Sequence, residues 1–352
     1  MARTLRIGNH EIGDHTPCYV IAEIGHNHQG KVEKARELFR EAKLAGAHAV
    51  KLQKRDNRGL YTRAAYNKPY DNENSFGATY GEHREFLEFG LQEYRELQGY
   101  ARELEVDFFA TAFDLASAEF LGELDVPAFK IASGDNTFYP LLQAIAQTGK
   151  PAILSTGLAD LEQVRSSMRR FELEGGAGAL AILHCVTSYP TLPEQANLSA
   201  IRTLKDAFPH NSVGYSDHTM GIRAAVASVA LGARIIEKHF TIDKQFSDFH
   251  DHQLSADPEE LTEMVLHIRE LETMLGTGEK VAQEGEENNR IGGRRSIVSK
   301  RSLRAGETVT LEDLTWMRPG DGMPPGDEHL LLGKRLTAPL QVGEPFSLEI
   351  VE

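Results

Sequence analysis

The chain has 352 residues, of which 41% are hydrophobic and 26% are charged, a composition typical of a folded protein with a large core and not of a disordered chain. Its length exceeds one ordinary domain and fits a large barrel followed by a small module. A formal net charge of -14 argues against nonspecific binding to nucleic acid or to an anionic membrane surface, so we expect neither as a partner. An anionic substrate would need a local group of cations.

The cysteine content and the N-terminal sequence indicate the cellular compartment in which the protein is expected. Cys18 and Cys185 lie within apolar runs, which leaves no disulfide framework and no zinc-binding cysteine spacing. The N-terminus lacks a signal-peptide pattern, and no apolar run approaches the roughly 20 residues that span a bilayer. We therefore expect a cytoplasmic location.

Short apolar runs alternate with amphipathic stretches from Cys18 to about Gly276, which predicts repeated β-α units and a parallel sheet. The first helix is predicted in KVEKARELFREAKLAGA, whose apolar residues recur at helical spacing and whose Gly46 is placed to end it. Eight strands are predicted, the number that closes a (β/α)8 TIM barrel. They begin at CYVIAEIG, AVKLQ, DFFATAF, AFKIAS, PAILST, LAILHCV, SVGYSD and RIIEKHF.

The connection after the second predicted strand is unusually long and runs from Lys54 to about His83. It is rich in Tyr, Asn and Gly and lies at the face where barrel enzymes carry their sites. Two interpretations stay open: a lid or specificity loop, or a surface excursion without a role.

A polar, glycine-containing stretch without periodicity follows the last predicted helix of the barrel. We expect the barrel to span residues 1–283, the linker 284–293 and a second domain 294–352. Short β-like runs separated by many turns predict that this second domain is small and mostly β.

Charged and polar side chains stand at the ends of the predicted strands, where a barrel core is otherwise apolar. Residues two apart on a strand face the same way, so three pairs are expected to meet at the C-terminal mouth of the barrel. Lys238 should point the other way, toward the helices or solvent. The pairs are Lys51 with Gln53, Ser216 with His218, and Glu237 with His239.

Lys51 and Lys130, with the hydroxyls of Ser133, Ser155 and Ser216, predict a pocket for a phosphate and a carboxylate together. Phosphoenolpyruvate carries both groups. The alternative is that each lysine extends from its strand end to solvent.

His218 and His239 end neighbouring predicted strands, which favours a shared divalent metal over two structural histidines. Two imidazoles alone indicate an open shell completed by water and substrate, suited to Mn or Mg. Glu23, Asp135 or Glu237 could add a carboxylate, directly or through water.

Short motifs follow one another in a fixed order along nearly the whole chain. YVIAEIGHNHQG, AVKLQ, FKIASGD, ILSTG, LHCVTSYPT, GYSDHT and EKHFT belong to successive predicted strands, DHQLS comes after the last of them, and RRSIV and MRPGDG lie in the small domain. Together they resemble the sialic acid (nonulosonate) synthases, and the last two resemble the antifreeze-like (SAF) domain that those enzymes carry. The resemblance implies a TIM barrel followed by this domain.

The resemblance also implies an activity. Such an enzyme condenses phosphoenolpyruvate with an N-acyl hexosamine-type aldehyde to a nine-carbon 2-keto sugar acid and releases phosphate by C–O cleavage. It implies catalytic roles for Glu23, which would handle protons or orient water, and for Asp135. The residues implied in phosphoenolpyruvate binding are Lys51, Lys130, Ser133, Ser155, Thr187 and Ser216.

The remaining implied roles concern the metal and the sugar. His218 and His239 would hold a divalent Mn or Mg ion that polarises the aldehyde. Arg318 would reach from the small domain of a partner chain to the N-acyl group of the sugar, which implies a domain-swapped homodimer. The other implied sugar contacts are Gln53, Tyr189 and Asp251.

Three departures from the family pattern fall mainly on the sugar side. Asp135 stands where the sialic acid members have Glu, and Thr187 stands where they have Asn. FSDFHDH replaces their usual approach to the sugar-binding Asp, so Asp248 is a rival to Asp251. We therefore expect the condensation with phosphoenolpyruvate, while the identity of the sugar substrate stays open.

Three alternatives remain at this point. The product could be a pseudaminate, legionaminate or spore-coat-type sugar in place of N-acetylneuraminate. A related barrel makes eight-carbon or seven-carbon keto acids from phosphorylated aldoses, but it lacks the C-terminal domain. A noncatalytic barrel that binds an anionic sugar is a third possibility, because a fold alone does not fix a function.

Overall fold

The computed structural model describes residues 4–176, 179–246 and 250–352. The chain divides into two compact units, residues 1–276 and 277–352. A short helix, α13 (Glu287–Gly293), occupies most of the segment expected to be a linker.

Within the described residues, eight parallel strands close a barrel in the order β10-β3-β4-β5-β6-β7-β8-β9. Each coincides with one of the apolar runs read from the sequence, which confirms the predicted TIM barrel. The strands are β3 (Tyr19–Gly25), β4 (Ala49–Lys54), β5 (Asp107–Ala112), β6 (Phe129–Ile131), β7 (Ala152–Ser155), β8 (Leu180–Cys185), β9 (Val213–Asp217) and β10 (Ile235–His239).

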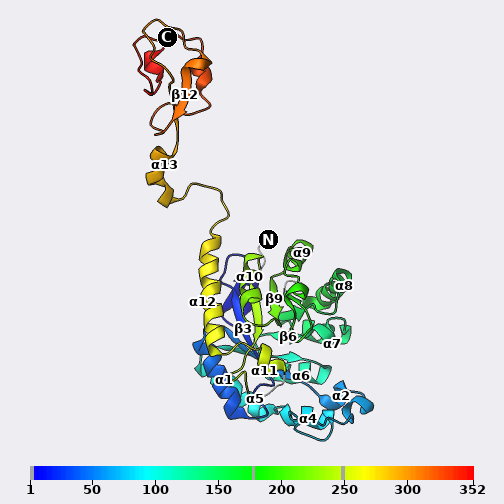
Figure 1. The fold of residues 1–352 in the computed structure, drawn as a ribbon. Helices are drawn as coiled ribbons and strands as arrows, with labels where there is room; N and C mark the ends of the chain where they lie inside the picture. The colour runs from blue at the N-terminus through cyan, green and yellow to red at the C-terminus, as the bar shows by residue number, and fades with distance from the viewer. Residues whose placement is uncertain (1–3, 177–178, 247–249) are drawn as a thin grey trace. The chain divides into compact units, whose positions relative to one another are not determined.

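Helices follow the strands and surround them, as Figure 1 shows for the first unit. A shorter helix, α11 (His250–Leu254), lies between β10 and the last of them. The surrounding helices are α1 (Val32–Leu44), α5 (Leu91–Glu103), α6 (Leu115–Glu123), α7 (Tyr139–Ala146), α8 (Leu161–Phe171), α9 (Ala200–Ala207), α10 (Arg223–Ala230) and α12 (Pro258–Leu275).

Helix α1 forms as its sequence pattern predicts. Ala35, Leu38, Phe39 and Ala42 recur three and four residues apart and are fully buried, so the apolar stripe faces the barrel. Gly46 follows the helix with a φ of +93°, a conformation that costs glycine little and other residues more. The amide of Gly46 donates to the Lys43 carbonyl and ends the helix.

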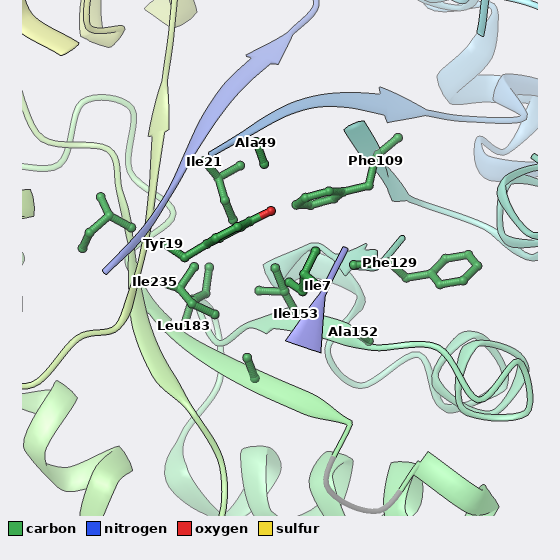
Figure 2. Packing of buried hydrophobic residues seen from close by; sticks show 14 of the residues in the cluster. Ile7, Tyr19, Ile21, Ala49, Phe109, Phe129, Ala152, Ile153, Leu183 and Ile235 are labelled. Atoms are coloured by element: carbon green, nitrogen blue, oxygen red, sulfur yellow. The ribbon is translucent and has the colours of Figure 1, made fainter. Parts of the chain in front are cut away.

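An antiparallel hairpin of β1 (Thr4–Ile7) and β2 (His10–Gly13) precedes the barrel and was not predicted. Ile7 is fully buried, and Figure 2 shows it among barrel side chains that include Tyr19 and Ile153. Asp107, the first residue of β5, accepts hydrogen bonds at one carboxylate oxygen from the Tyr19 hydroxyl at 2.7 Å and from the ring of His10 at 2.9 Å. The hairpin therefore packs at the N-terminal end of the barrel, opposite the mouth.

The long connection after β4 is ordered into short helices. They are α2 (Asn57–Leu60), α3 (Arg63–Tyr66) and α4 (Tyr80–Leu87). Thr79 and Glu82 form a capping box at the start of α4, in which each side chain accepts a hydrogen bond from the backbone of the other. The Tyr80 ring packs edge-to-face against Tyr61 at an interplanar angle of 76° and against Tyr70 at 69°, so aromatic rings hold the segment together.

The second unit is small and mostly irregular, with one antiparallel pair of strands, β11 (Ser296–Ser299) and β12 (Leu314–Met317), among its described residues. Its core includes Ile297, Leu331 and Phe346, each buried to 1% exposure or less. Across the described part of the chain, no helix is both long enough and apolar enough to cross a membrane.

Candidate active site

The C-terminal ends of the barrel strands surround a cavity of about 270 Å³. Parallel strands in a closed barrel all end at the same face, which is why residues far apart in the sequence meet there. The cavity is lined by these predicted site residues: Glu23, Lys51, Gln53, Lys130, Ser133, Ser155, Thr187, Tyr189, Ser216, His218, His239 and Asp251.

The register of the strands orders the charged side chains around the mouth. Glu23 on β3 pairs with His239 on β10 at one side and with Lys51 on β4 at the other. Ser216 on β9 pairs with Glu237 on β10. An imidazole on β10, a carboxylate on β3 and an ammonium group on β4 therefore lie next to one another.

Lys51 and Lys130 are 2% and 3% exposed, so the interpretation that they extend to solvent is wrong. Lys51 forms an ion pair with Glu23 and donates to the Thr111 hydroxyl at 2.7 Å. Lys130 donates to the Ser155 hydroxyl at 2.7 Å. A buried ammonium group is retained in a core only where such partners satisfy it.

Glu237 joins the two lysines. Its carboxylate oxygens lie 3.9 Å from the Lys51 amino group and 3.8 Å from that of Lys130, and the Ser216 hydroxyl donates to it at 3.3 Å. Two ammonium and two carboxylate groups thus share one buried cluster. Its formal charge is near zero when all four are ionised.

Burial moves the pKa values within this cluster. Desolvation raises the pKa of Glu23 above 4.5, with Lys51 opposing the shift and Glu237 adding to it. Desolvation also lowers the pKa of Lys130, although Glu237 opposes that shift. For Glu237 itself burial favours the protonated form, but the two lysines outweigh it and lower the pKa. Glu23 is therefore the carboxylate of the cluster that takes up a proton most readily.

Lys238 follows the alternation expected from the sequence. It is fully buried on the outer side of β10, where its amino group pairs with Asp217 at 3.0 Å and donates to the Thr219 carbonyl at 2.6 Å. It does not line the cavity. This buried pair ties β10 to β9 behind the site.

The two histidines lie side by side, with ring centroids 5.3 Å apart. The Nδ1 atom of His218 lies 2.8 Å from the Val186 carbonyl, which can only accept, so Nδ1 carries a proton and, in the neutral ring, Nε2 keeps the lone pair. Tyr189 packs on His218 at 4.1 Å between centroids. This orienting hydrogen bond is the arrangement that metal-binding histidines commonly have.

The mouth of the barrel offers a metal ion few direct protein ligands. No group of three His, Cys, Asp or Glu side chains is arranged to hold a metal ion within the described residues. A carboxylate ligand that binds directly, considered for Glu23, Asp135 and Glu237, is thus not found there. The pair of imidazoles fits a divalent ion only where water or substrate completes its shell.

Asn136, which was not predicted from the sequence, holds the loop that carries Ser133 in place. Asn136 donates to the carbonyls of Ser133 at 2.7 Å and Gly157 at 2.9 Å, which ties the loops after β6 and β7 together. The Gly157 amide donates to the Ser133 hydroxyl oxygen at 3.0 Å, which orients that hydroxyl in the cavity. A Cβ at Gly157 would lie 2.7 Å from the Ser133 oxygen, which explains a glycine at this position.

Of the predicted site residues that the structure describes in the barrel unit, Asp135 is not among those that line the cavity. Asp135 lies on a 3-10 turn after β6, and burial raises its pKa to about 6, with Arg55 opposing and Asp114 adding to the shift. Arg318 belongs to the second unit. Asp248 lies outside the described residues.

Three polar residues that line the cavity were not predicted: Arg55, Arg84 and Thr111. Lys51, Gln53 and Arg55 alternate along one strand and its extension, so the same spacing argument that singled out the first two could have found the third. Arg84 lies on α4, the last helix of the long connection, and no local pattern points to it.

The comparisons with known proteins agree with this geometry. The NeuB family model matches residues 38–280, and the SAF domain model matches residues 294–351. The N-acetylneuraminate-9-phosphate synthase of Mus musculus is 38% identical over 345 residues, which cover 97% of this chain and 94% of that protein. The N,N'-diacetyllegionaminic acid synthase of Legionella pneumophila is also 38% identical, over 344 residues that cover 97% and 96% of the two chains.

A solved structure gives the same result. The N-acetylneuraminic acid (sialic acid) synthetase from Leptospira borgpetersenii, in complex with citrate, superposes with a TM-score of 0.73 and 34% sequence identity. The match covers 82% of this chain and 95% of that one. The barrel, the residues at its mouth and the order of the domains place the chain in the NeuB family, with a C-terminal SAF domain.

Proposed function

We propose that the chain condenses phosphoenolpyruvate with an N-acyl hexosamine-type aldehyde to a nine-carbon 2-keto sugar acid and releases phosphate by C–O cleavage. The observation that carries this proposal is the convergence of two buried lysines, two buried carboxylates and two histidines in one cavity at the mouth of the barrel. Membership of the NeuB family supports the same reaction.

Phosphoenolpyruvate is bound at the lysine end. Lys51 and Lys130 supply charge-assisted hydrogen bonds to its phosphate and carboxylate groups. Neutral donors complete the shell, because an anion with several oxygens needs more hydrogen bonds than two ammonium groups give. These donors are Ser133, Ser155, Thr187 and Ser216.

The bond-forming step joins carbon 3 of the enolpyruvate to the aldehyde carbon and leaves an oxocarbenium at carbon 2. Water then adds to carbon 2, and the bond from that carbon to the bridging oxygen breaks, so that phosphate leaves with this oxygen. Of the two protons that water loses, one goes to the former aldehyde oxygen and the other to the leaving phosphate. The atoms of the substrates and of one water molecule balance in the keto acid and phosphate.

Glu23 handles these protons. Its raised pKa favours the protonated form, so Glu23 can hold a proton in the buried cluster, as a general acid must. Gln53 donates to the Glu23 carboxylate at 2.6 Å and fixes its orientation. Asp135, whose pKa burial raises to about 6, is the second proposed catalytic carboxylate.

His218 and His239 are the proposed ligands of a divalent Mn or Mg ion. Such an ion supplies Lewis-acid polarisation of the aldehyde oxygen. The chain itself orients the imidazoles, since Val186 fixes the tautomer of His218 and Tyr189 packs against its ring.

Gln53, Tyr189 and Asp251 are the proposed contacts of the sugar. The names of the relatives differ in the sugar acid that is made: the mouse protein is a synthase of a 9-phosphate, and the Legionella protein is a synthase of a diacetylated acid. Under this proposal the reaction at the carbonyl carbon of the aldehyde is the same for either sugar. The residues at the sugar end therefore decide between substrates and not between reactions.

We further propose a cytoplasmic, domain-swapped homodimer in which Arg318 of one chain contacts the N-acyl group of the sugar bound by its partner. Arg318→Ala is then expected to raise the KM for the sugar by about 10- to 100-fold and to change the KM for phosphoenolpyruvate little, because one charged hydrogen bond contributes about 1.5–3 kcal/mol. Steady-state kinetics with each substrate varied in turn measures both constants.

Mixing Arg318→Ala with an inactive Lys130→Met chain checks whether the arginine acts between chains. After exchange of subunits, mixed dimers contain one intact site and should regain part of the activity. An absence of recovery in dimers shown to have exchanged would mean that each site is completed within one chain.

The proposal as a whole is tested by phosphate release. The full-length protein is incubated with phosphoenolpyruvate, Mn²⁺ and a panel of N-acyl hexosamines and their 6-phosphates. We expect phosphate release with at least one of these sugars and none without a sugar. A folded protein that binds the sugars but releases no phosphate with any of them would instead be a noncatalytic binding protein.

A further inference from the structure

The cavity has a second basic region, distinct from the lysine cluster. Arg55 follows β4 and Arg84 lies on α4, and both line the same cavity as Lys51 and Lys130. Arg55 is 8% exposed and Arg84 is partly buried. Neither residue has a part in the binding of phosphoenolpyruvate described above.

The two guanidinium groups bracket one imidazole. Nη1 of Arg55 lies 3.1 Å from Nε2 of His26, and Nη1 of Arg84 lies 3.1 Å from Nδ1 of the same ring. His26 is buried, and its desolvation and the nearby arginines hold its pKa well below 6.5, so the ring is neutral. A neutral imidazole has one lone pair and can accept from only one of them. One guanidinium N–H at this ring is therefore left without an acceptor.

Few carboxylates lie close enough to balance the positive charges of Arg55 and Arg84. Glu88 lies 3.8 Å from Arg55, but it also lies 3.3 Å from Lys54. No carboxylate oxygen lies within 4.0 Å of the Arg84 guanidinium among the described residues, although Asp251 attracts it at longer range. Nε of Arg84 donates to the Tyr80 hydroxyl. Nη2 of Arg84 has no hydrogen-bond partner among the residues that the structure describes. This contrasts with the lysine cluster, where each ammonium group has a carboxylate within 4.0 Å.

The pair is also connected to the proposed catalytic carboxylate. Arg55 donates to the Gln53 side-chain oxygen at 2.6 Å, and the Gln53 nitrogen donates to Glu23 at 2.6 Å. One side chain thus separates Arg55 from the reacting end of the cavity. An extended sugar whose aldehyde lies at Glu23 and the histidines would pass Gln53 and place its far end toward the arginines.

We propose that Arg55 and Arg84 bind the phosphate of an N-acyl hexosamine 6-phosphate, and that this phosphorylated sugar is the aldehyde substrate. The guanidinium group presents its donors as a planar fork that matches two phosphate oxygens, and it keeps its charge when buried. The phosphate supplies the acceptors that His26 and the described carboxylates do not. This inference rests on the proposed condensation and extends it by fixing the charge of the second substrate.

The test compares two sugars with the full-length protein, Mn²⁺ and saturating phosphoenolpyruvate. They are N-acetylmannosamine, which gives N-acetylneuraminate when a three-carbon keto acid unit is added, and its 6-phosphate. The wild-type protein should prefer the 6-phosphate by at least about 100-fold in kcat/KM. Arg84→Gln should reduce this preference by about 10- to 100-fold, through a higher KM for the 6-phosphate, and should change kcat/KM for N-acetylmannosamine by less than about threefold.

A matched variant controls for changes in the same segment. Arg58 on α2 is exposed and pairs with Glu85 on α4 at 3.0 Å, and it does not line the cavity. Arg58→Gln should keep the wild-type preference. Thermal melting of each variant confirms that it is folded.

The outcomes separate this inference from the proposed function. A preference for N-acetylmannosamine, or an equal loss with both sugars in folded Arg84→Gln, would overturn the phosphate site and leave the condensation intact. A folded wild-type protein that forms no keto acid from either sugar, or from any other hexosamine, would overturn both.

Discussion

Lys130→Met is expected to lower kcat/KM for phosphoenolpyruvate by about 10³-fold, which corresponds to about 4 kcal/mol of transition-state binding. Lys130 is buried and lines the cavity, and it is one of two ammonium groups available to a trianionic substrate there. Methionine has a similar length and lacks the charge, so phosphate and carboxylate oxygens would lose a charge-assisted partner in a desolvated site. Initial-rate measurements of phosphate release over a range of phosphoenolpyruvate concentrations give this ratio.

Lys54→Met is the matched control for the loss of a lysine at a strand end. Lys54 ends β4, but its amino group binds Glu88 at 3.3 Å and the Phe89 carbonyl at 2.8 Å, outside the cavity. We expect kcat/KM for phosphoenolpyruvate to stay within about threefold of the wild-type value. A similar loss in both variants would show that Lys130 matters for stability and not for the substrate.

His239→Ala is expected to reduce turnover by about 10³-fold and to prevent reactivation by Mn²⁺. Removal of metal from the wild-type protein with a chelator should abolish activity, and added Mn²⁺ should restore it. With one imidazole left, the chain offers a divalent ion too few ligands to compete with water. Titration with Mn²⁺, followed by electron paramagnetic resonance of the free ion, measures binding directly.

His184→Ala serves as the corresponding control. His184 lies on β8, and its ring binds the Ala196 carbonyl at 2.8 Å outside the cavity. Folded His184→Ala should keep the affinity for Mn²⁺. Full activity of the wild-type protein after complete removal of metal would remove the ion from the proposed chemistry.

The barrel and the lysine cluster could be predicted from the sequence for a simple reason. A barrel strand is apolar on both faces, so a charged residue within such a run is conspicuous, and a spacing of two residues places it on one face. This spacing correctly predicts that Lys51 and Glu237 face the mouth of the barrel and that Lys238 faces away from it. It also explains why the strands themselves were found.

Other parts of the structure have no local sequence pattern from which they could be predicted. The N-terminal hairpin has strands of four residues, too short for a clear alternation, and Ile7 is buried only because the barrel provides a surface for it. Arg84 reaches the cavity through the fold of α2, α3 and α4, which depends on contacts among aromatic rings such as those of Tyr61 and Tyr80. Tertiary packing, and not local pattern, decides these positions.

The proposed reaction depends on one chemical event, the breaking of the bond between carbon 2 and the bridging oxygen of phosphoenolpyruvate after a new C–C bond forms. Phosphoenolpyruvate labelled with ¹⁸O at the bridging position tests this event with the full-length protein, Mn²⁺ and N-acetylmannosamine 6-phosphate or N-acetylmannosamine. We predict that mass spectrometry will find the label in the released phosphate and one unlabelled carbonyl oxygen, derived from water, in a nine-carbon keto acid. Label retained on carbon, or phosphate released without a nine-carbon product, would contradict the account.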